Sequence, residues 1–231
     1  MASAQGKEAF MTSVQRTICV VGGTGAEGSG LALRWAHHGH TVIIGSRDAT
    51  KAQATADELN GLIGEARLRG SDSASGVKEA DIVVLTVPFQ AQMSTAEALK
   101  NELQGKILVD VTVPLVPPKV ARVQLPPSDS CVVALQEMLG EGVRVVSAFQ
   151  NVSAHKLKDL SYNIECDVLV TGDDKEARQT VIALAGDAGL KGIDAGPLAN
   201  SVVAEALTSA LIHINRTYKI PDAGIRITGL R

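Results

Sequence analysis

Three glycines near the N-terminus are spaced as in loops that bind the phosphates of a dinucleotide. The motif comprises Gly23, Thr24, Gly25, Ala26, Glu27 and Gly28. It follows a β-branched apolar segment and opens a segment rich in helix formers. In this context the first glycine permits a tight turn, the second lets the backbone approach a pyrophosphate, and the third lets helix and strand pack closely. Because a helix N-terminus also attracts anions, we predict a dinucleotide site here.

The residues after the second predicted strand indicate which dinucleotide binds. Proteins that bind NAD usually place a carboxylate about 20 residues beyond the glycine motif, where it holds the ribose hydroxyls. This chain has Ser46 and Arg47 there, followed by Lys51. A guanidinium can hold a 2′-phosphate through two hydrogen bonds, whereas we interpret Asp48 as a helix N-cap. The pattern favours NADP(H) over NAD(H), although Arg47 and Lys51 would also suit a solvated helix face.

No residue pattern indicates acid–base, nucleophilic or metal catalysis, and we predict no catalytic side chain and no metal site. The five histidines are His37, His38, His40, His155 and His213. Only His155 follows a segment expected to meet a substrate, and we favour a non-catalytic role for it. Asp173 and Asp174 fit a turn and helix N-cap better than a metal site. Hydride transfer between two bound rings needs mainly orientation, whereas an alcohol dehydrogenase also needs a positioned base.

The elements that must position these residues alternate between strand and helix. Short apolar runs predict strands at 17–22, 41–45, 66–70, 81–88, 106–115, 144–149, 167–172 and 191–196. Helical patterns cover 28–38, 48–62, 131–139, 175–188 and 198–218, and a Pro-rich loop spans 114–127. The order predicts an α/β, Rossmann-like, doubly wound and mainly parallel sheet with a small helical C-terminal part. Ligands of such sheets bind at the carboxyl ends of the strands.

Composition narrows the class of protein. The net charge is −3 and aromatic residues make up only 3%, which disfavours binding to nucleic acid or to an anionic membrane. Cys19, Cys131 and Cys166 are far apart, so we expect reduced thiols and a cytoplasmic location. We expect a disordered tail over 1–15, an NADP-binding Rossmann domain over 16–196, and a helical part over 197–231 that walls the substrate pocket and contacts a second copy.

The segment VVGGTGAEGSGLALRWAHHGHTVIIGSR resembles the opening of the NADPH-dependent reductases of coenzyme F420, a 5-deazaflavin. The resemblance continues through DIVVLTVPF, VVSAFQNVSA and DAGPLANSVVAEALT, and so covers most of the chain. Part of the first block is shared with metalloreductases and pyrroline-carboxylate reductases, whereas GGTG, GSR and GPLANS together are more specific. The resemblance implies a homodimer that exchanges a hydride between NADP(H) and coenzyme F420 as co-substrate.

The resemblance also implies roles for single residues. It assigns Thr24, Ser46, Arg47 and Lys51 to the 2′-phosphate, Thr86, Val87 and Pro88 to the nicotinamide ribose, and Ala154 to the carboxamide. The acceptor ring is expected near Gln150, Asn151, Leu198 and Asn200. Some archaeal members have His-Thr where this chain has Gln150-Asn151, and glutamine can hydrogen-bond a ring carbonyl but cannot titrate.

Two other functions stay open at this point. The first is reduction of a different acceptor, such as a flavin, a chelated ferric ion or a cyclic imine. The second is a non-enzymatic NADP(H)-sensing module, since the same fold hosts many functions. A sensor would not need an open second pocket beside the nicotinamide, so the acceptor side of the site separates these functions.

Overall fold

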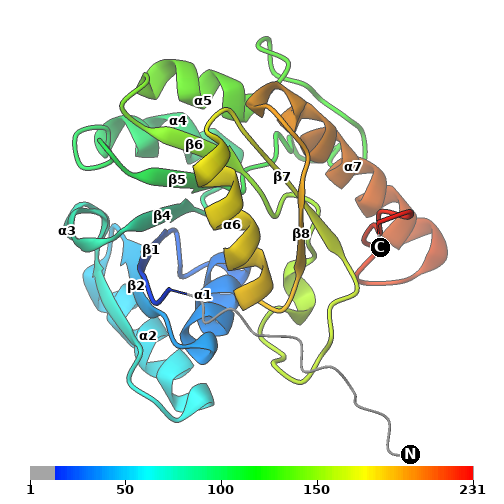
Figure 1. Ribbon diagram of the computed structural model, residues 1–231. Coiled ribbons are helices and arrows are strands. Elements are labelled where there is room, and N and C mark those ends of the chain that lie inside the picture. The colour runs from blue at the N-terminus through cyan, green and yellow to red at the C-terminus, as the bar shows by residue number, and fades with distance from the viewer. Residues whose placement is uncertain (1–13, 231) are drawn as a thin grey trace, which may run out of the picture.

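A single sheet of eight strands crosses the molecule, for which the computed structural model describes residues 14–230 (Figure 1). The strands lie in the order β3-β2-β1-β4-β5-β6-β7-β8, and every neighbouring pair is parallel except β6 and β7. They are β1 Thr17–Val21, β2 Thr41–Ser46, β3 Leu68–Asp72, β4 Ile82–Leu85, β5 Ile107–Asp110, β6 Arg144–Ser147, β7 Asp167–Gly172 and β8 Lys191–Asp194. The predicted doubly wound, mainly parallel fold is confirmed.

Helices cover both faces of this sheet, which explains why β4 is apolar at every position and buried throughout. The helices are α1 Ala26–His38, α2 Ala49–Ile63, α3 Ser73–Glu79, α4 Phe89–Ala98, α5 Cys131–Leu139, α6 Lys175–Asp187 and α7 Ser201–Tyr218. One core cluster joins the sheet to α1, α2 and α6. A second cluster joins the other face to α3, α4 and α5. The strand order reverses between β1 and β4, so their carboxyl ends form the switch point where ligands bind.

Local sequence signals set most helix starts. The side chains of Asp48, Asp72, Ser130 and Asp174 each accept a hydrogen bond from a backbone N–H in the first turn of the helix that follows. The roles predicted for Asp48 and Asp174 as N-caps are therefore confirmed. Helices α3 and α4 were not expected. Helix α3 has only seven residues, two of them serine and one glycine, so its sequence gives little helical signal. The Pro-rich segment 114–127 contains no helix or strand, as predicted.

Other expectations remain predictions. The tail expected over 1–15 lies almost entirely outside the described residues. The division of the chain at residues 196–197 stays a prediction, although a helix, α7, does follow it. Within residues 14–230, no helix is long and apolar enough to cross a membrane.

Candidate functional site

The turn between β1 and α1 forms the centre of the candidate site. Gly22 adopts a φ of +82°, and a Cβ atom there would lie 2.9 Å from the backbone oxygen of Thr86. At Gly28 a Cβ atom would collide with Oγ1 of Thr86 and lie 2.9 Å from Cα of Gly23. These contacts support the predicted role of Gly28 in close packing, while the left-handed residue of the turn is Gly22 rather than Gly23. Gly25 is more open, because a Cβ there would meet only the oxygen of Gly22, at 3.4 Å.

Helix α1 presents unpaired backbone N–H groups beside this turn. Its N-cap is Gly25, which has no side chain to satisfy them. Within the described chain, the backbone nitrogens of Ala26, Glu27 and Gly28 have no hydrogen-bond partner, whereas that of Ser29 donates to the oxygen of Gly25 at 2.9 Å. Open N–H groups and the positive end of a helix of 13 residues make this position suited to a diphosphate.

A cleft of about 880 Å³ runs past this helix end along the carboxyl edge of the sheet. Of the predicted cofactor residues, it is lined by Thr24, Gly25, Ala26, Glu27, Ser46, Arg47, Thr86, Val87 and Pro88. Gly23 and Gly28 lie behind the turn, and Lys51 is exposed on α2 without lining the cleft. The far wall comes from α4 and from the segment after β5, including Val111, Thr112 and Val113. The structure thus brings most of the predicted dinucleotide residues into one cavity.

Ser46 and Arg47 mark one end of the cleft, at the end of β2. The Ser46 hydroxyl accepts a hydrogen bond from the Asp48 N–H at 3.2 Å, and the Asp48 carboxylate accepts one from the Lys51 N–H at 3.0 Å. Asp48 is therefore engaged in capping α2, and the Arg47 guanidinium has no ion-pair partner within residues 14–230. A free guanidinium at this strand end fits a 2′-phosphate.

A buried carboxylate, that of Asp110, lies at the carboxyl end of β5, directly before the segment that forms part of the cleft wall. Asp110 is fully buried and accepts hydrogen bonds from the Thr112 N–H, at 2.6 Å, and from the Gln92 amide. Burial raises the pKa of Asp110 to about 6, although these hydrogen bonds oppose the shift. Burial, and then the nearby charge of Asp110, raise the pKa of Glu27 to about 8. Two acids that hold protons more tightly than usual thus lie beside the cleft.

A second buried carboxylate ties the C-terminal helix to this region. Glu205 of α7 accepts hydrogen bonds from the Ser130 hydroxyl at 2.6 Å and from the backbone nitrogen of Cys131 at 3.0 Å. It therefore accepts hydrogen bonds from donors at the N-terminus of α5 and so ties α7 to that helix. Sequence reasoning missed Asp110 and Glu205. Each of these residues is a carboxylate inside a segment whose other residues form the pattern of an apolar strand or an apolar helix, and this contrast could have identified it.

The predicted acceptor-side residues do not line the cleft. Gln150 and Asn151 are 3% and 2% exposed, and their amide nitrogens donate to backbone oxygens of Asp110 and Asp167. Leu198 is also buried, whereas Asn200 is exposed at the start of α7. Ala154 is the first residue of the short 3-10 helix η1 (Ala154–Lys156) and packs against the core. The amide oxygens of Gln150 and Asn151 are buried without a hydrogen-bond partner within the described residues.

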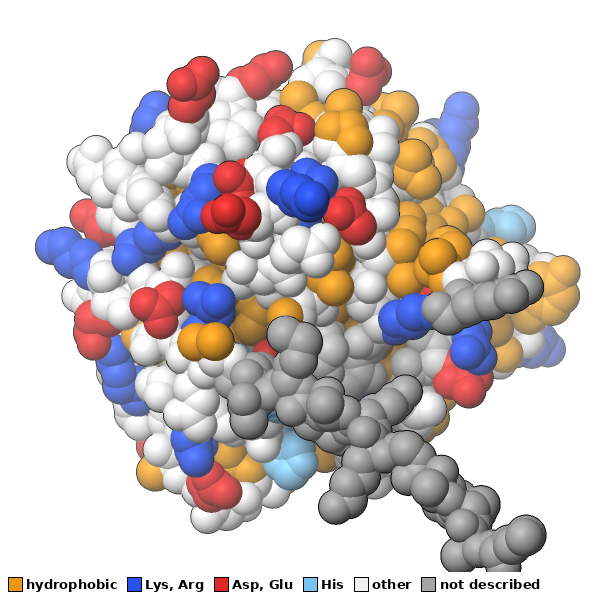
Figure 2. All heavy atoms as spheres, viewed as in Figure 1, with side chains coloured by type: hydrophobic (Ala, Val, Ile, Leu, Met, Phe, Trp, Pro, Cys, Tyr) orange, Lys and Arg blue, Asp and Glu red, His pale blue; other side chains and the backbone are white. Residues whose placement is uncertain are grey.

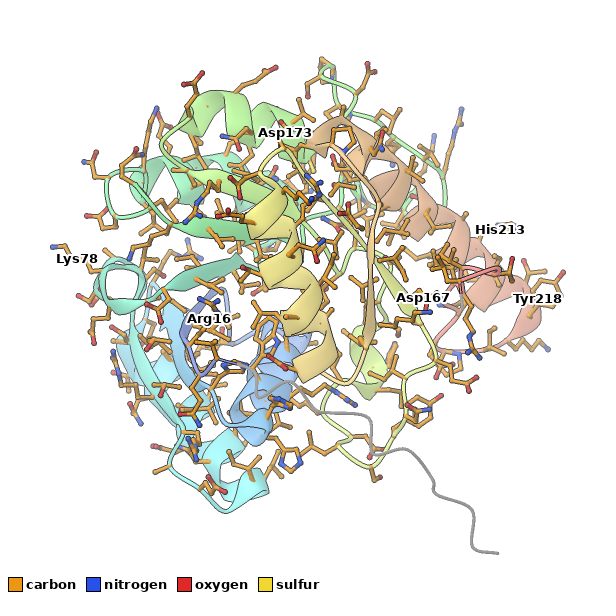
Figure 3. All side chains as sticks on the ribbon, viewed as in Figure 1. Arg16, Lys78, Asp167, Asp173, His213 and Tyr218 are labelled. Atoms are coloured by element: carbon orange, nitrogen blue, oxygen red, sulfur yellow. The ribbon has the colours of Figure 1, made fainter. Side chains whose placement is uncertain are left out.

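None of the histidines in the described chain lines the cleft. His38 and His40 contact opposite oxygens of Asp187 at 3.0 and 2.9 Å, and His155 is exposed. His213 projects from the outer side of α7 (Figure 3). Within residues 14–230, no three His, Cys, Asp or Glu side chains are grouped so that they could hold a metal ion.

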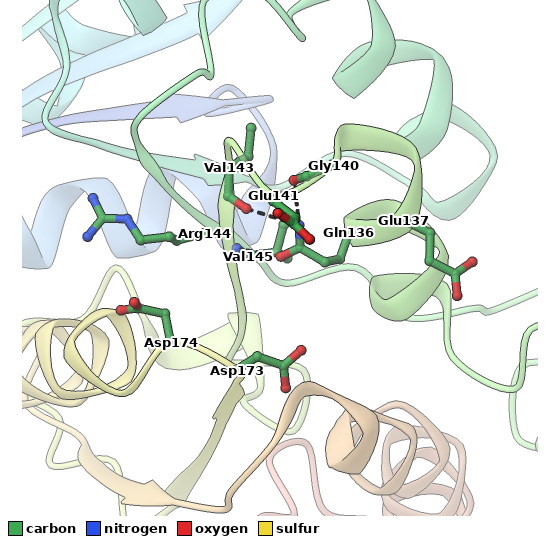
Figure 4. A pocket seen from close by; sticks show the side chains of 9 residues that line it. All are labelled: Gln136, Glu137, Gly140, Glu141, Val143, Arg144, Val145, Asp173 and Asp174. Carbon is green, nitrogen blue, oxygen red and sulfur yellow. Dashed lines mark hydrogen bonds between the residues drawn. The ribbon is translucent and has the colours of Figure 1, made fainter.

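A smaller hollow of about 570 Å³ lies at the amino end of β6, where Arg144, Val145 and Asp173 are among the residues that line it (Figure 4). Two of its acids already have structural partners. Asp173 accepts a hydrogen bond from the Leu198 N–H at 2.9 Å, and Asp174 accepts one from the Ala177 N–H at 2.6 Å. None of the residues that line this hollow also lines the dinucleotide cleft, and the cap expected of Asp174 is present.

Comparisons with known proteins agree with the geometry. Residues 17–114 match a protein-family model described as NADP oxidoreductase, coenzyme F420-dependent. The F420-dependent NADP reductase of Methanocaldococcus jannaschii is 42% identical over 92% of this chain and 98% of that protein. Its counterpart in Methanothermobacter marburgensis is 40% identical over the same shares. The crystal structure of a putative F420-dependent NADP reductase from an Arthrobacter species superposes with a TM-score of 0.76, at 25% identity over 92% of this chain and 99% of that one.

Proposed function

Because this chain belongs to the family of F420-dependent NADP reductases, we propose that it transfers a hydride between NADP(H) and coenzyme F420. The observation that carries the proposal is similarity over nearly the full length of the relatives, which includes both the glycine turn and the C-terminal helix. The alternatives of a flavin, ferric-ion or imine reductase and of a cofactor sensor have no comparable support, because three relatives with 38–42% identity over 92% of the chain all carry the name of one activity.

The residues of the cleft suit the cofactor. Arg47 and Ser46 would hold the 2′-phosphate, and the open N–H groups of α1 would hold the pyrophosphate. The nicotinamide end would then lie against Thr86 and Val111, at the ends of β4 and β5. NADPH supplies the hydride, and the protein has to orient the two rings and exclude water. Apolar side chains of α4 and of the segment after β5 would exclude water from the cleft.

The proposal also names the residues that would contact the acceptor. Gln150, Asn151, Leu198 and Asn200 remain our proposed acceptor residues, supported by the two buried amide oxygens that have no partner among the described residues. A direct assay mixes the protein with NADPH and, in turn, oxidised deazaflavin, a flavin or a cyclic imine. It follows the near-ultraviolet absorbance of NADPH with each acceptor, and also the visible absorbance of the deazaflavin and of the flavin. We expect turnover with the deazaflavin. Turnover with a flavin and none with the deazaflavin would contradict the proposal.

We also propose a cytoplasmic homodimer. The supporting observation for dimerisation is that Val203 of α7 is 57% exposed and Tyr218 is 70% exposed. Hydrophobic side chains gather over α7 and the segment after it (Figure 2). A contiguous apolar face of this kind favours contact with a second copy. The three cysteine thiols are buried and unpaired, which suits a reducing compartment. Sedimentation equilibrium of the wild type and of Val203→Lys tests the dimer, since the variant should shift toward the monomer.

A further inference from the structure

The cleft wall at the carboxyl end of β5 lies beyond the last residue of that strand, so contacts outside the sheet must hold it. Thr112 lines the cleft two residues after β5 ends at Asp110. Its N–H donates to the Asp110 carboxylate at 2.6 Å, and its backbone oxygen accepts a weak hydrogen bond from the Cys131 thiol at 3.7 Å. The Thr112 hydroxyl is buried without a partner within residues 14–230. The position of this wall therefore depends on Asp110 and Cys131.

Cys131, the buried first residue of α5, joins these contacts to the C-terminal helix. Its backbone oxygen accepts a hydrogen bond at 3.4 Å from the Gln92 amide, and the same amide nitrogen donates to Asp110. The backbone N–H of Cys131 donates to the Glu205 carboxylate of α7 at 3.0 Å. Both contacts that hold Thr112 are thus linked through Cys131 to Glu205, which lies 74 residues further along the chain.

The capping of α5 alone does not account for Glu205. Ser130 already caps this helix, because its hydroxyl accepts a hydrogen bond from the Val133 N–H at 3.1 Å. Glu205 is only 1% exposed and has no ion-pair partner within residues 14–230. Burial of a carboxyl group without a cation costs stability. Its contact with the backbone of Cys131 therefore indicates a role that the Ser130 cap does not fulfil.

We propose that Glu205 is a positioning residue for hydride transfer, which fixes Cys131 and thereby the cleft wall at Thr112. This inference rests on the proposed function, because that function places the nicotinamide against the ends of β4 and β5. Glu205 itself does not line the cleft, so it acts through the wall and touches neither ring. Loss of its hydrogen bonds should let the wall shift, and a small displacement of a reacting ring lowers the rate strongly.

Two substitutions separate the hydrogen bonds of Glu205 from the size of its side chain. Glu205→Leu keeps a side chain of similar size and removes both acceptor oxygens. In Glu205→Gln, the amide oxygen can still accept from the Cys131 N–H. The amide nitrogen can donate to the Ser130 hydroxyl, because a hydroxyl both donates and accepts. We therefore expect a defect in Glu205→Leu and its rescue in Glu205→Gln.

The measurement separates the two ends of the cofactor. Adenosine 2′,5′-bisphosphate carries the 2′-phosphate but no nicotinamide, so its binding also counts the intact sites. For Glu205→Leu we expect Kd for this fragment to stay within about threefold, while the ratio of Kd for NADPH to Kd for the fragment rises about threefold to tenfold. With NADPH and the deazaflavin, kcat per site should fall at least about tenfold. For Glu205→Gln each value should stay within about threefold of the wild type.

Gln136→Leu is the matched control, because Gln136 lies near the other end of α5 and makes three hydrogen bonds to the backbone of Gly140, Val143 and Val145. It should lower the free energy of unfolding and leave kcat per site unchanged. A wild-type binding ratio and kcat in Glu205→Leu overturn the inference, as does an equal fall of kcat per site in Gln136→Leu.

Two further outcomes are informative. If Glu205→Leu does not fold, Glu205→Asp takes its place, because its carboxylate is withdrawn by one methylene and should change the ratio and kcat in the same direction. Absence of deazaflavin turnover in the wild type would contradict the proposed function. The ratio of the two dissociation constants needs no acceptor, so it would then decide on Glu205 by itself, and the two failures are distinguishable.

Discussion

The side-chain amide of Gln150 donates a hydrogen bond to the backbone oxygen of Asp110 at 2.8 Å. The same nitrogen donates to the Ser147 hydroxyl at 2.8 Å, so that Gln150 joins the carboxyl ends of β5 and β6. This inward direction follows from Phe149, whose φ of +74° reverses the chain directly before Gln150. The ring of Phe149 is fully buried and packs edge-on against Trp35, with 5.9 Å between ring centroids.

Gln150→Ala should therefore affect both stability and acceptor use. It removes two buried hydrogen bonds and leaves a small cavity, so we expect the free energy of unfolding to fall by about 2–3 kcal/mol. NADPH affinity should stay within about threefold, while KM for the deazaflavin rises. Urea denaturation and steady-state kinetics measure these effects, with exposed Gln179→Ala on α6 as the control. An unchanged free energy of unfolding would show that the Gln150 hydrogen bonds contribute little. Equal losses of affinity for NADPH and for the deazaflavin would show that the loop serves folding rather than recognition.

A methyl group at Gly28 should disturb the turn that holds the cofactor. Because its Cβ would collide with Thr86 and Gly23, Gly28→Ala has to displace α1 from the turn. We expect NADPH affinity to fall more than about tenfold, with a loss of stability of about 1–3 kcal/mol. Gly61→Ala on α2 is the control, because nothing lies within 4 Å of its added Cβ, and it should stabilise the protein by about 0.5–1 kcal/mol. Undiminished NADPH binding by Gly28→Ala would contradict the close packing.

The raised pKa values of Glu27 and Asp110 predict how stability depends on pH. Their native values of about 8 and about 6 exceed the reference values of 4.5 and 3.8, so the native state holds these protons more tightly than the unfolded state does. Stability is then lost as pH rises from the reference value toward the native value. Between about pH 5 and pH 8, the free energy of unfolding should fall by about 1–2 kcal/mol less for Glu27→Gln than for the wild type, allowing for partial solvent exposure. Urea denaturation at several pH values measures this difference. The same pH dependence of the free energy of unfolding in the wild type and in Glu27→Gln would contradict the prediction.

Much of the fold and of the site could be predicted from local sequence. Apolar runs located the eight strands, and the caps at Asp48 and Asp174 followed from residue type and position. What could not be predicted depends on contacts between distant segments. The Glu205 carboxylate meets Ser130 and Cys131, which are more than 70 residues away in the chain. A left-handed phenylalanine has no sequence signature, so the inward direction of Gln150 could not be foreseen.

Arg47 tests the choice of cofactor. If its guanidinium holds the 2′-phosphate, Arg47→Ala should weaken NADPH binding by about 10- to 100-fold and leave NADH binding within about threefold. Ser46→Ala should act in the same direction but less. Lys51→Ala should fall between them and be the most sensitive to salt, because Lys51 is exposed. Titration of both cofactors against each variant gives the answer, and a parallel loss for NADPH and NADH would remove the main support for NADP specificity.

The most direct test of the proposed reaction follows the hydride itself. NADPH is prepared with deuterium at C4 of the reduced nicotinamide, in each of the two stereoisomers, and is mixed with oxidised deazaflavin and the protein in ordinary water. Because both rings are to be held in one water-excluding cleft, one stereoisomer should transfer its deuterium to the ring carbon of the deazaflavin and the other should retain it on NADP⁺. Mass spectrometry of both products measures the label. Deuterium released to water, or transferred equally from both stereoisomers, would contradict direct transfer between two rings oriented by this site.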